Sequence, residues 1–315
     1  MTIDETVALL RRNDNILILT HKRPDGDTVG CAASLCAALR AQGKTAWVQE
    51  NPEATDLFTP YLAAYLAPED VTVDFVVSVD IAGRGLFTER GKRWLERGVD
   101  LAIDHHPSYE GFGAESCVDA SRAACGELLY DILRQLGPIT PEIALPLYVA
   151  VSTDTGCFEY GNTTPGTHRV AAALMEAGID YQSANKRHFR TKSYKRLRLE
   201  SMLVEGMHLY QNGKVAIAAI TLADMATLQA TERDAEDIAA FVGQLEGVET
   251  SVTIRELRPG FCKLSVRTSG GLNASKVCAL LGGGGHAAAS GCEISGSVED
   301  AGKVILHAIE TIQGG

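Results

Sequence analysis

Aspartate and histidine side chains gather at four places in this 315-residue chain, each shortly after an apolar run. Short apolar runs rich in β-branched residues are typical of buried strands in a parallel sheet, and ligands bind outside the carboxyl ends of such strands. We therefore expect the clusters to converge at one edge of a sheet. Their members are His21, Asp25 and Asp27 in the first cluster, Asp80 in the second, Asp104, His105 and His106 in the third, and Asp154 in the fourth.

Carboxylates crowded at one edge repel each other unless cations lie between them. Two divalent ions are the simplest resolution. Mixed imidazole and carboxylate ligands suit Mn²⁺ better than Mg²⁺, which prefers oxygen ligands and water. Two such ions can activate water and stabilise an in-line displacement at phosphorus. The sequence thus predicts a two-metal site for phosphoester hydrolysis, with two Mn²⁺ ions as cofactors and Mg²⁺ or Co²⁺ as substitutes.

Strand and helix patterns alternate through the first part of the chain, which is typical of a doubly wound α/β sheet. We predict strands over residues 15–20, 44–48, 74–80 and 99–104, and helices over 28–41, 121–135, 143–151 and 167–177. Residues 183–210 contain no proline and carry seven basic side chains, so they are predicted to form one long helix.

A smaller α/β region is predicted from Gly213 onward. Its strands are expected at 214–220, 249–257, 261–266 and 290–294, with a helix over 234–245, a glycine loop at 282–285 and a final helix. The fold prediction is therefore an α/β protein with a parallel-sheet N-terminal domain, a long joining helix and a smaller C-terminal domain. The predicted boundaries are 1–182 for the catalytic metal-binding domain, 183–210 for the helical linker and 211–315 for the substrate-binding domain.

These motifs resemble those of the DHH phosphoesterases, which are named after the sequence seen here at Asp104-His105-His106. The segment from His21 to Asp27 resembles their first motif, Asp80 their second and Asp154 their fourth, in the same order and with similar spacing. Near the C-terminus, four glycines before His286, followed by Ser290-Gly291, resemble the glycine-rich motif of the DHH-associated C-terminal domain. The resemblance covers nearly the whole chain.

The resemblance implies a role for each cluster residue. One metal would be held by His21, Asp25 and Asp80, and the other by Asp27, Asp80, His105 and Asp154, so that Asp80 bridges the two ions. Asp104 is expected to orient a histidine through its ring N–H. His106 is expected near the scissile phosphate, where it would stabilise charge or protonate the leaving oxygen.

The C-terminal motif implies a nucleotide-binding role. Glycines allow close backbone approach and expose N–H groups to anions, so Gly283, Gly284 and Gly285 are expected to contact the substrate. His286 is expected near a phosphate. Arg267 ends a predicted strand and is a natural bidentate phosphate ligand. The N-terminal domain would then supply the chemistry, and the C-terminal domain would recognise the nucleotide.

Among DHH proteins, the compact NrnA-like branch fits this chain best. The resemblance implies hydrolysis of short oligoribonucleotides to mononucleotides, and of 3′-phosphoadenosine-5′-phosphate (pAp) to AMP and phosphate. Three alternatives stay open: a cyclic or linear dinucleotide phosphodiesterase, an inorganic pyrophosphatase or polyphosphatase, and a non-catalytic nucleotide sensor. The known pyrophosphatases of this superfamily carry a different C-terminal domain, and the presence of every metal-ligand position disfavours the sensor.

The net charge of −11 disfavours non-specific binding of long duplexes, which needs many phosphate contacts. Five aspartates of the predicted site contribute to this charge, and two bound cations would make the site attractive to phosphate. No apolar run approaches the roughly 18–20 residues that span a bilayer, and the acidic N-terminus lacks signal-peptide features. We therefore expect a cytoplasmic enzyme with reduced cysteines. Its expected substrates are short single-stranded RNA or nucleotides, and no membrane partner is expected. The oligomeric state is left open, and a homodimer is one possibility.

Overall fold

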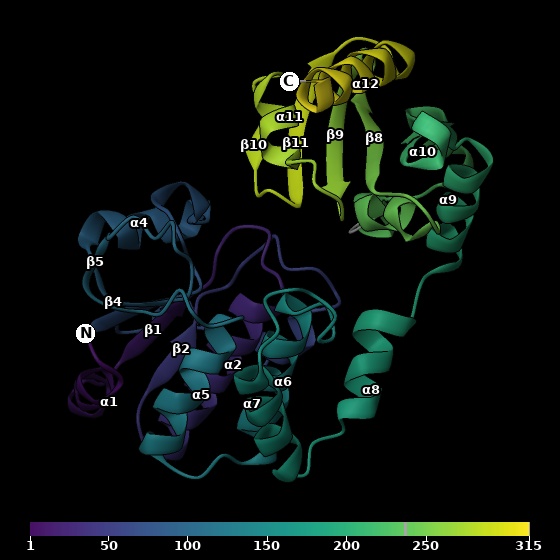
Figure 1. Ribbon diagram of the computed structural model, residues 1–315. Helices are drawn as coiled ribbons and strands as arrows, with labels where there is room; N and C mark the ends of the chain where they lie inside the picture. Colours follow the sequence, from purple (N-terminus) through teal and green to yellow (C-terminus); the bar gives the residue numbers. More distant parts are fainter. Residues whose placement is uncertain (236–237, 315) are drawn as a thin grey trace. The chain divides into compact units, whose positions relative to one another are not determined.

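The computed structural model describes residues 1–235 and 238–314. The chain divides into two compact units, Met1–Thr191 and a second that begins at Lys192 (Figure 1). Each unit has its own sheet and its own hydrophobic core. The α/β class predicted from the sequence is therefore confirmed.

The first unit is built on a five-stranded, wholly parallel sheet with the order β2-β1-β3-β4-β5. In parallel sheets of this kind, the carboxyl edge beside the point where strand order reverses is the usual ligand site. Here that point lies between β1 and β3. The strands are β1 (Ile16–Leu19), β2 (Ala46–Val48), β3 (Phe75–Val79), β4 (Val99–Asp104) and β5 (Gly113–Val118).

Strand β5 has no counterpart among the predicted strands. Three of its six residues are exposed, and only Cys117 is buried. An edge strand with so few buried positions has no continuous apolar run, the feature that marks the other four strands in the sequence.

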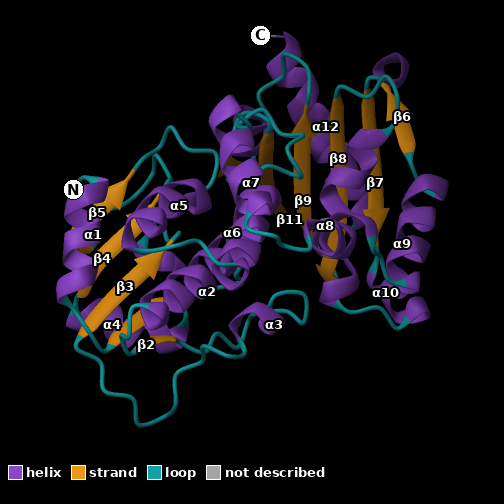
Figure 2. Ribbon diagram, turned by 90° about the horizontal axis from the view of Figure 1, so that it is seen from below, coloured by secondary structure: helices purple, strands orange, loops and turns teal. Residues whose placement is uncertain are grey.

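Alternate side chains of the strands face two separate apolar layers. Ile16 and Ile18 pack with one group of helices, while Leu17 and Leu19 face the opposite layer beside Trp94. The sheet is thus covered on both faces (Figure 2), as parallel sheets require. The helices on the first face are α1 (Ile3–Arg12), α2 (Gly26–Ala41), α3 (Thr59–Leu62), α5 (Cys125–Leu136), α6 (Pro141–Asp154) and α7 (Pro165–Glu176); α4 (Glu89–Arg97), preceded by the short 3₁₀ turn η1 (Arg84–Leu86), covers the second.

Helices α2 and α6 pack closely because α2 has glycines at the contact. A Cβ atom at Gly30 would lie 2.2 Å from the carbonyl oxygen of Pro146 and 2.8 Å from Cβ of Ala150. A Cβ at Gly26 would lie 2.2 Å from Oγ1 of Thr153. This contact brings the first turn of α2 against the last turn of α6.

Gly30→Ala is therefore expected to lower the free energy of unfolding by about 1–3 kcal/mol, as overpacked cores do. The clash with a backbone carbonyl outweighs the gain of about 1 kcal/mol in helix propensity. Denaturant unfolding measures the change. Gly85→Ala is the matched control, because a Cβ at Gly85 would meet nothing within 4 Å. Equal stability of the two variants would show that the helices can separate at no cost.

The prediction of a single helix over 183–210 is wrong. The chain forms α8 (Tyr181–Asn185) and the π-helical turn η2 (Lys186–Arg190), and is then extended at Thr191 with φ −105° and ψ 122°. Ser193 starts a new helix, α9 (Tyr194–Glu205), by accepting a hydrogen bond from the amide of Arg196, and strand β6 (His208–Tyr210) follows. Serine is a preferred N-cap residue, and here the cap at Ser193 outweighed the absence of proline.

The second unit contains a six-stranded mixed sheet with the order β10-β11-β9-β8-β7-β6, in which only β7 and β8 are parallel neighbours. The predicted hairpin is confirmed, with Gly260 at φ 70° in its turn. The sheet of this unit packs against α11 and α12 on one face and against α9 on the other. The further elements are η3 (Gln211–Gly213), β7 (Val215–Ile220), α10 (Leu222–Leu228), β8 (Thr250–Arg258), β9 (Phe261–Thr268), α11 (Ala274–Ala279), β10 (Gly284–Gly285), β11 (Ala289–Ser295) and α12 (Val298–Gly314).

Two local predictions for this unit need correction. The helix expected over 234–245 consists, where described, of the 3₁₀ segments η4 (Glu232–Ala235) and η5 (Ile238–Gln244); residues 236–237 of that prediction lie outside the described part. The loop expected at 282–285 contains strand β10, because Gly284 and Gly285 pair with Gly291 and Ser290. No helix in the described part of the chain is long and apolar enough to cross a membrane.

Candidate metal centre

The carboxyl ends of three adjacent strands bring the sequence motifs together. His21 follows β1, Asp80 follows β3, and Asp104 ends β4. Because β3 lies between β1 and β4, Asp80 occupies the middle of this row. These three residues therefore lie at one edge of the sheet, as the sequence predicts.

Asp80 lies between the histidines of its two neighbours. Its Oδ2 atom is 3.7 Å from Nε2 of His21, and its Oδ1 atom is 3.6 Å from Nε2 of His105. The backbone of Asp80 is left-handed, with φ 58°, a sparsely populated conformation for a residue other than glycine. Oδ1 is buried and has no hydrogen-bond partner among the described residues. A buried carboxylate oxygen of this kind is costly unless a further group binds it.

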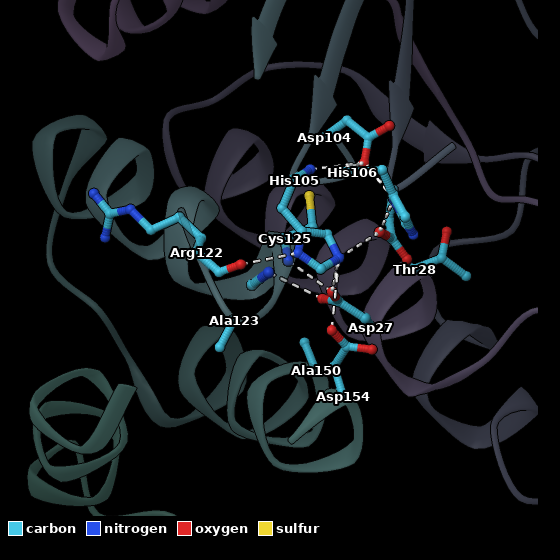
Figure 3. Close-up of polar contacts among 12 residues, drawn as sticks. Asp27, Thr28, Asp104, His105, His106, Arg122, Ala123, Cys125, Ala150 and Asp154 are labelled. Atoms are coloured by element: carbon cyan, nitrogen blue, oxygen red, sulfur yellow. Dashed lines mark hydrogen bonds and ion pairs between the residues drawn. The ribbon is translucent and has the colours of Figure 1, made fainter. Parts of the chain in front are cut away.

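Backbone carbonyls fix the orientation of two histidine rings. Nδ1 of His21 lies 2.9 Å from the carbonyl oxygen of Lys22, and Nδ1 of His105 lies 3.2 Å from that of Arg122. A carbonyl accepts only, so in the neutral ring each Nδ1 carries the proton and each Nε2 keeps a lone pair. Nε2 of His21 faces Asp25 at 3.4 Å, and Nε2 of His105 faces Asp154 at 3.5 Å (Figure 3 shows the second contact). This is the arrangement of metal-binding histidines.

Helix N-termini hold the two aspartates of the first motif. Asp25 caps α2, where its Oδ1 accepts from the amides of Asp27 and Thr28 at 3.0 and 3.2 Å. Asp27 is buried and accepts from the amides of Cys125 and Gly126 at 2.6 and 2.9 Å, at the start of α5 (Figure 3). Both contacts favour negative charge at these positions.

Asp154 reaches the cluster from a helix instead of a strand. It is the last residue of α6, and its Oδ2 lies 3.5 Å from Nε2 of His105. Figure 3 shows Asp154 and Asp27 on the same side of that ring. The close packing of α2 on α6 is therefore what places the fourth motif beside the first.

The crowding of carboxylates shows in their pKa values. Burial raises the pKa of Asp27 well above its usual range, and the charges of Asp154 and Asp25 raise it further. Burial and the charge of Asp27 do the same to the pKa of Asp80. Burial, followed by the charge of Asp25, raises the pKa of Asp154 to about 7. Without cations, the site therefore disfavours full ionisation.

The pKa values of the three histidines shift in different directions. Burial lowers the pKa of His105. Burial also acts to lower the pKa of His21, but the contact with Asp25 outweighs it and the net shift is upward. The hydrogen bond to Asp104 raises the pKa of His106, so this ring holds a proton more readily than an isolated imidazole.

His106 stands apart from the other two histidines. Its side chain is 37% exposed, whereas those of His21 and His105 are 14% and 13% exposed. Its Nδ1 lies 2.7 Å from Oδ1 of Asp104, and this oxygen also accepts from the amides of His105 and His106. Asp104 thus fixes the ring and leaves Nε2 of His106 as the nitrogen available to a substrate.

The side chains fit divalent metal ions. Three groups each bring ligand atoms within 4.8 Å of each other: His21 with Asp25 and Asp80, Asp27 with His105 and Asp154, and Asp80 with His105 and His106. Mixed nitrogen and oxygen ligands, an orphaned carboxylate oxygen and lone pairs aimed inward are the features such ions require. The third group competes with the bond from His106 to Asp104, which already occupies Nδ1.

The predicted nucleotide-binding residues lie together at one end of the second sheet. Arg267, on β9, pairs with Ala289 on β11 and with Ser251 on β8. His286 is exposed in the turn that joins β10 to β11, where its amide donates to the carbonyl of Ala289 at 2.8 Å.

Two of the glycines have structural reasons to be there. A Cβ at Gly283 would lie 2.2 Å from the carbonyl oxygen of Gly291, and Gly285 has φ 145°. Gly284 has no such constraint, since a Cβ there would meet nothing within 4 Å. The tight hairpin therefore explains Gly283 and Gly285 even without a ligand.

Two supports of the cluster escaped the sequence reasoning. The start of α5, at Cys125, carries the amides that bind Asp27. Asn162 donates through Nδ2 to the carbonyls of Asp154 and Ala123, at 3.1 and 3.0 Å. No local pattern marks either residue, because both act through contacts between distant segments.

Residues 15–151 match the DHH family, N-terminal domain, and residues 212–313 match the DHHA1 domain. The crystal structure of an exopolyphosphatase-related protein from Bacteroides fragilis is similar to the chain. It superposes with a TM-score of 0.87 at 25% identity, covering 98% of this chain and 95% of that one.

Two curated relatives carry the name bifunctional oligoribonuclease and PAP phosphatase NrnA. The protein from Thermus thermophilus is 32% identical over 305 residues, which cover 93% of this chain and 89% of the relative. The protein from Bacillus subtilis is 24% identical over 319 residues, which cover 98% and 97%. With both domains matched and this similarity along nearly the full length, the chain belongs to the NrnA family of DHH phosphoesterases.

Proposed function

We propose that this chain is a Mn²⁺-dependent phosphoesterase that hydrolyses short oligoribonucleotides to mononucleotides and pAp to AMP and phosphate. The observation that carries the proposal is the position of Asp80, whose two carboxylate oxygens face the histidines of two separate ligand groups. The names of the relatives support the choice of substrates.

Each cluster residue has a proposed role. One ion would be held by His21, Asp25 and Asp80, whose ligand atoms lie within 4.8 Å of one another. The other would be held by Asp27, His105 and Asp154, and Asp80 would be available to both, since its Oδ1 lies 3.6 Å from Nε2 of His105. This division follows the two distinct ligand groups on either side of Asp80, and it uses the inward-facing Nε2 atoms of His21 and His105.

The ions, when bound, supply Lewis-acid stabilisation for an in-line displacement at phosphorus. The protein supplies a proton donor. Asp104 holds Nδ1 of His106, so Nε2–H of that ring is the group that can protonate the leaving oxygen or bind a phosphoryl oxygen. Asp104 acts through His106 and is therefore a positioning residue.

Nucleotide recognition is assigned to the second unit. Arg267, His286 and the backbone of Gly283, Gly284 and Gly285 are proposed to bind a phosphate and the sugar–phosphate backbone of the substrate. The guanidinium of Arg267 is held by a hydrogen bond from Nη1 to the carbonyl of Val266 at 3.1 Å, which leaves its other N–H groups for an anion.

Arg267→Ala is expected to raise KM for pAp and for a five-residue RNA about tenfold or more, because hydrogen bonds to charged groups contribute about 1.5–3 kcal/mol. Hydrolysis of a small aryl phosphodiester is expected to change far less, because this substrate has no nucleotide for Arg267 to bind. Steady-state kinetics on the three substrates decide the matter. Equal losses on all three would place Arg267 in folding or in the metal site, and no loss on any would remove it from substrate binding.

The overall proposal is tested with purified protein and Mn²⁺ on pAp, a linear dinucleotide, a five-residue RNA, cyclic di-AMP and pyrophosphate. Hydrolysis of pAp and RNA is the expected result. Pyrophosphate as the preferred substrate would favour a pyrophosphatase, and cyclic di-AMP as the preferred substrate would favour a dinucleotide phosphodiesterase. Binding without hydrolysis of any substrate would identify a sensor.

Several coarser features accompany the proposal. The domain boundaries at residues 182 and 211 are proposed on the sequence motifs. A cytoplasmic location fits eight free cysteines, seven of them buried as small apolar side chains. A homodimer is proposed as the assembly to test, and sedimentation or light scattering measures it.

A further inference from the structure

The backbone directly after Asp154 is left-handed at three successive residues. Gly156, Cys157 and Phe158 have φ values of 55°, 58° and 69°. Glycine adopts this conformation freely, but Cys157 and Phe158 adopt it only under constraint. Such strain persists where surrounding contacts impose it, and it often occurs at ligand-binding sites.

Local hydrogen bonds impose the strained turn. The amide of Cys157 donates to the carbonyl of Ser152 at 2.7 Å, and the amide of Phe158 donates to Oγ1 of Thr155 at 3.3 Å. The amide of Tyr160 donates to the carbonyl of Thr155 at 3.0 Å. The turn is therefore tied back onto the last turn of α6, whose final residue is Asp154.

The turn directs its two aromatic rings differently. Phe158 packs on His168, with ring centroids 5.2 Å apart, and on Tyr148 at 6.2 Å, so it anchors the turn to the core. Tyr160 is 58% exposed. Its ring lies across Gly156, where a Cβ atom would be 2.4 Å from both Cε1 and Cζ. An exposed aromatic ring is thus held against the backbone two residues from Asp154.

A second tie fixes this loop to the metal centre. Asn162 donates to the carbonyls of Asp154 and Ala123. Ala123 follows Arg122, whose carbonyl holds the ring of His105. The segment that presents Tyr160 is therefore anchored beside two of the proposed metal ligands, His105 and Asp154.

We propose that Tyr160 is the stacking surface of a nucleobase subsite beside the metal centre, which binds the base of the nucleotide whose phosphate is cleaved. The inference rests on the proposed hydrolysis of nucleotides. The proposed roles of the cluster residues are to bind metal and phosphate, whereas every base can stack on an aromatic ring without regard to sequence. One such surface would serve both the adenine of pAp and the terminal base of a short RNA.

The subsite is tested by comparing Tyr160→Ala with Tyr160→Phe on pAp, on the matching sugar bisphosphate that lacks a base, and on a five-residue RNA. Tyr160→Ala is expected to raise KM at least about fivefold on the substrates with bases, the size expected for one lost stack. The abasic substrate should lose much less, Tyr160→Phe should behave as wild type, and metal content should be unchanged in both variants. Tyr194→Ala is the matched control, because Tyr194 is a 73% exposed tyrosine on α9.

Binding of 2-aminopurine riboside 5′-monophosphate gives a second readout that does not depend on turnover. Stacking of the 2-aminopurine base on residue 160 should quench the fluorescence of the probe in the wild type and in Tyr160→Phe. The quenching should disappear in Tyr160→Ala. Wild type that quenches the probe but hydrolyses nothing would refute the proposed function and keep the subsite. Equal KM changes with and without a base, or quenching that survives in Tyr160→Ala, would overturn the subsite.

Discussion

Asp80→Asn is expected to abolish hydrolysis of pAp and short RNA and to remove both metal ions from the protein. The reason is geometric, because each carboxylate oxygen of Asp80 faces the histidine of a different ligand group. Asp80 belongs to two of the ligand groups, one with His21 and Asp25 and one with His105 and His106. Metal analysis of the dialysed protein and an assay with added Mn²⁺ measure the two effects.

Chelation is the second half of this experiment. Treatment of the wild type with a chelator should abolish hydrolysis, and Mn²⁺ should restore it, whereas Asp80→Asn should stay inactive with Mn²⁺ present. The matched control is Asp74→Asn, since Asp74 is exposed just before the opposite end of the same strand, where it accepts a hydrogen bond from Asn15. This variant should keep metal and activity. Full activity of chelated wild type would contradict the two-metal proposal.

Loss of activity in Asp80→Asn must be separated from loss of fold. In the metal-free protein, the carboxylates repel each other, and burial with the charge of Asp27 already raises the pKa of Asp80. Replacing one of them with a neutral amide should leave the metal-free melting temperature unchanged or higher. A much lower melting temperature would mean that Asp80 is needed for folding, and the activity result would then carry no weight.

His106→Ala is expected to lower kcat by roughly 10²–10⁴-fold, the usual contribution of a general acid or base. Metal content should stay near that of the wild type, because Nδ1 of His106 is bound to Asp104 and its ring is the most exposed of the three. His105→Ala provides the contrast. Its Nε2 faces Asp27, Asp80 and Asp154 at 3.5–3.8 Å, so this variant should lose metal as well as activity.

Asp104→Asn gives an intermediate test of the same assignment. The side-chain oxygen of the introduced asparagine can still accept a hydrogen bond from Nδ1 of His106. It lacks the negative charge that helps to raise the pKa of His106. A smaller fall in kcat than in His106→Ala is expected, together with a lower apparent pKa for the proton donor in the pH profile of kcat. If His106→Ala instead empties a metal site, the roles assigned to His105 and His106 are reversed.

The sequence by itself predicted the cluster of candidate metal ligands in the first unit and most of its strands. His21, Asp80 and Asp104 each follow or end a buried apolar run, and parallel strands end at one edge, so their convergence could be predicted. The family resemblance predicted the C-terminal domain, and the match of residues 212–313 to the DHHA1 domain confirms it. The division of labour between the two domains stays a prediction. The convergence of the candidate ligands could be predicted because it depends on local patterns and on one general rule of sheet topology.

Contacts between distant segments decided the rest. Asp154 lies at the end of a helix, and it meets His105 because glycines let α2 and α6 approach closely. The inward lone pairs of the histidines depend on the carbonyls of Lys22 and Arg122. Strand β5 and the break before α9 escaped prediction because an exposed edge strand has little apolar pattern and a new N-cap can end a favourable helical run. Sequence periodicity reports which side chains are buried, but only tertiary packing fixes which backbone atoms meet them.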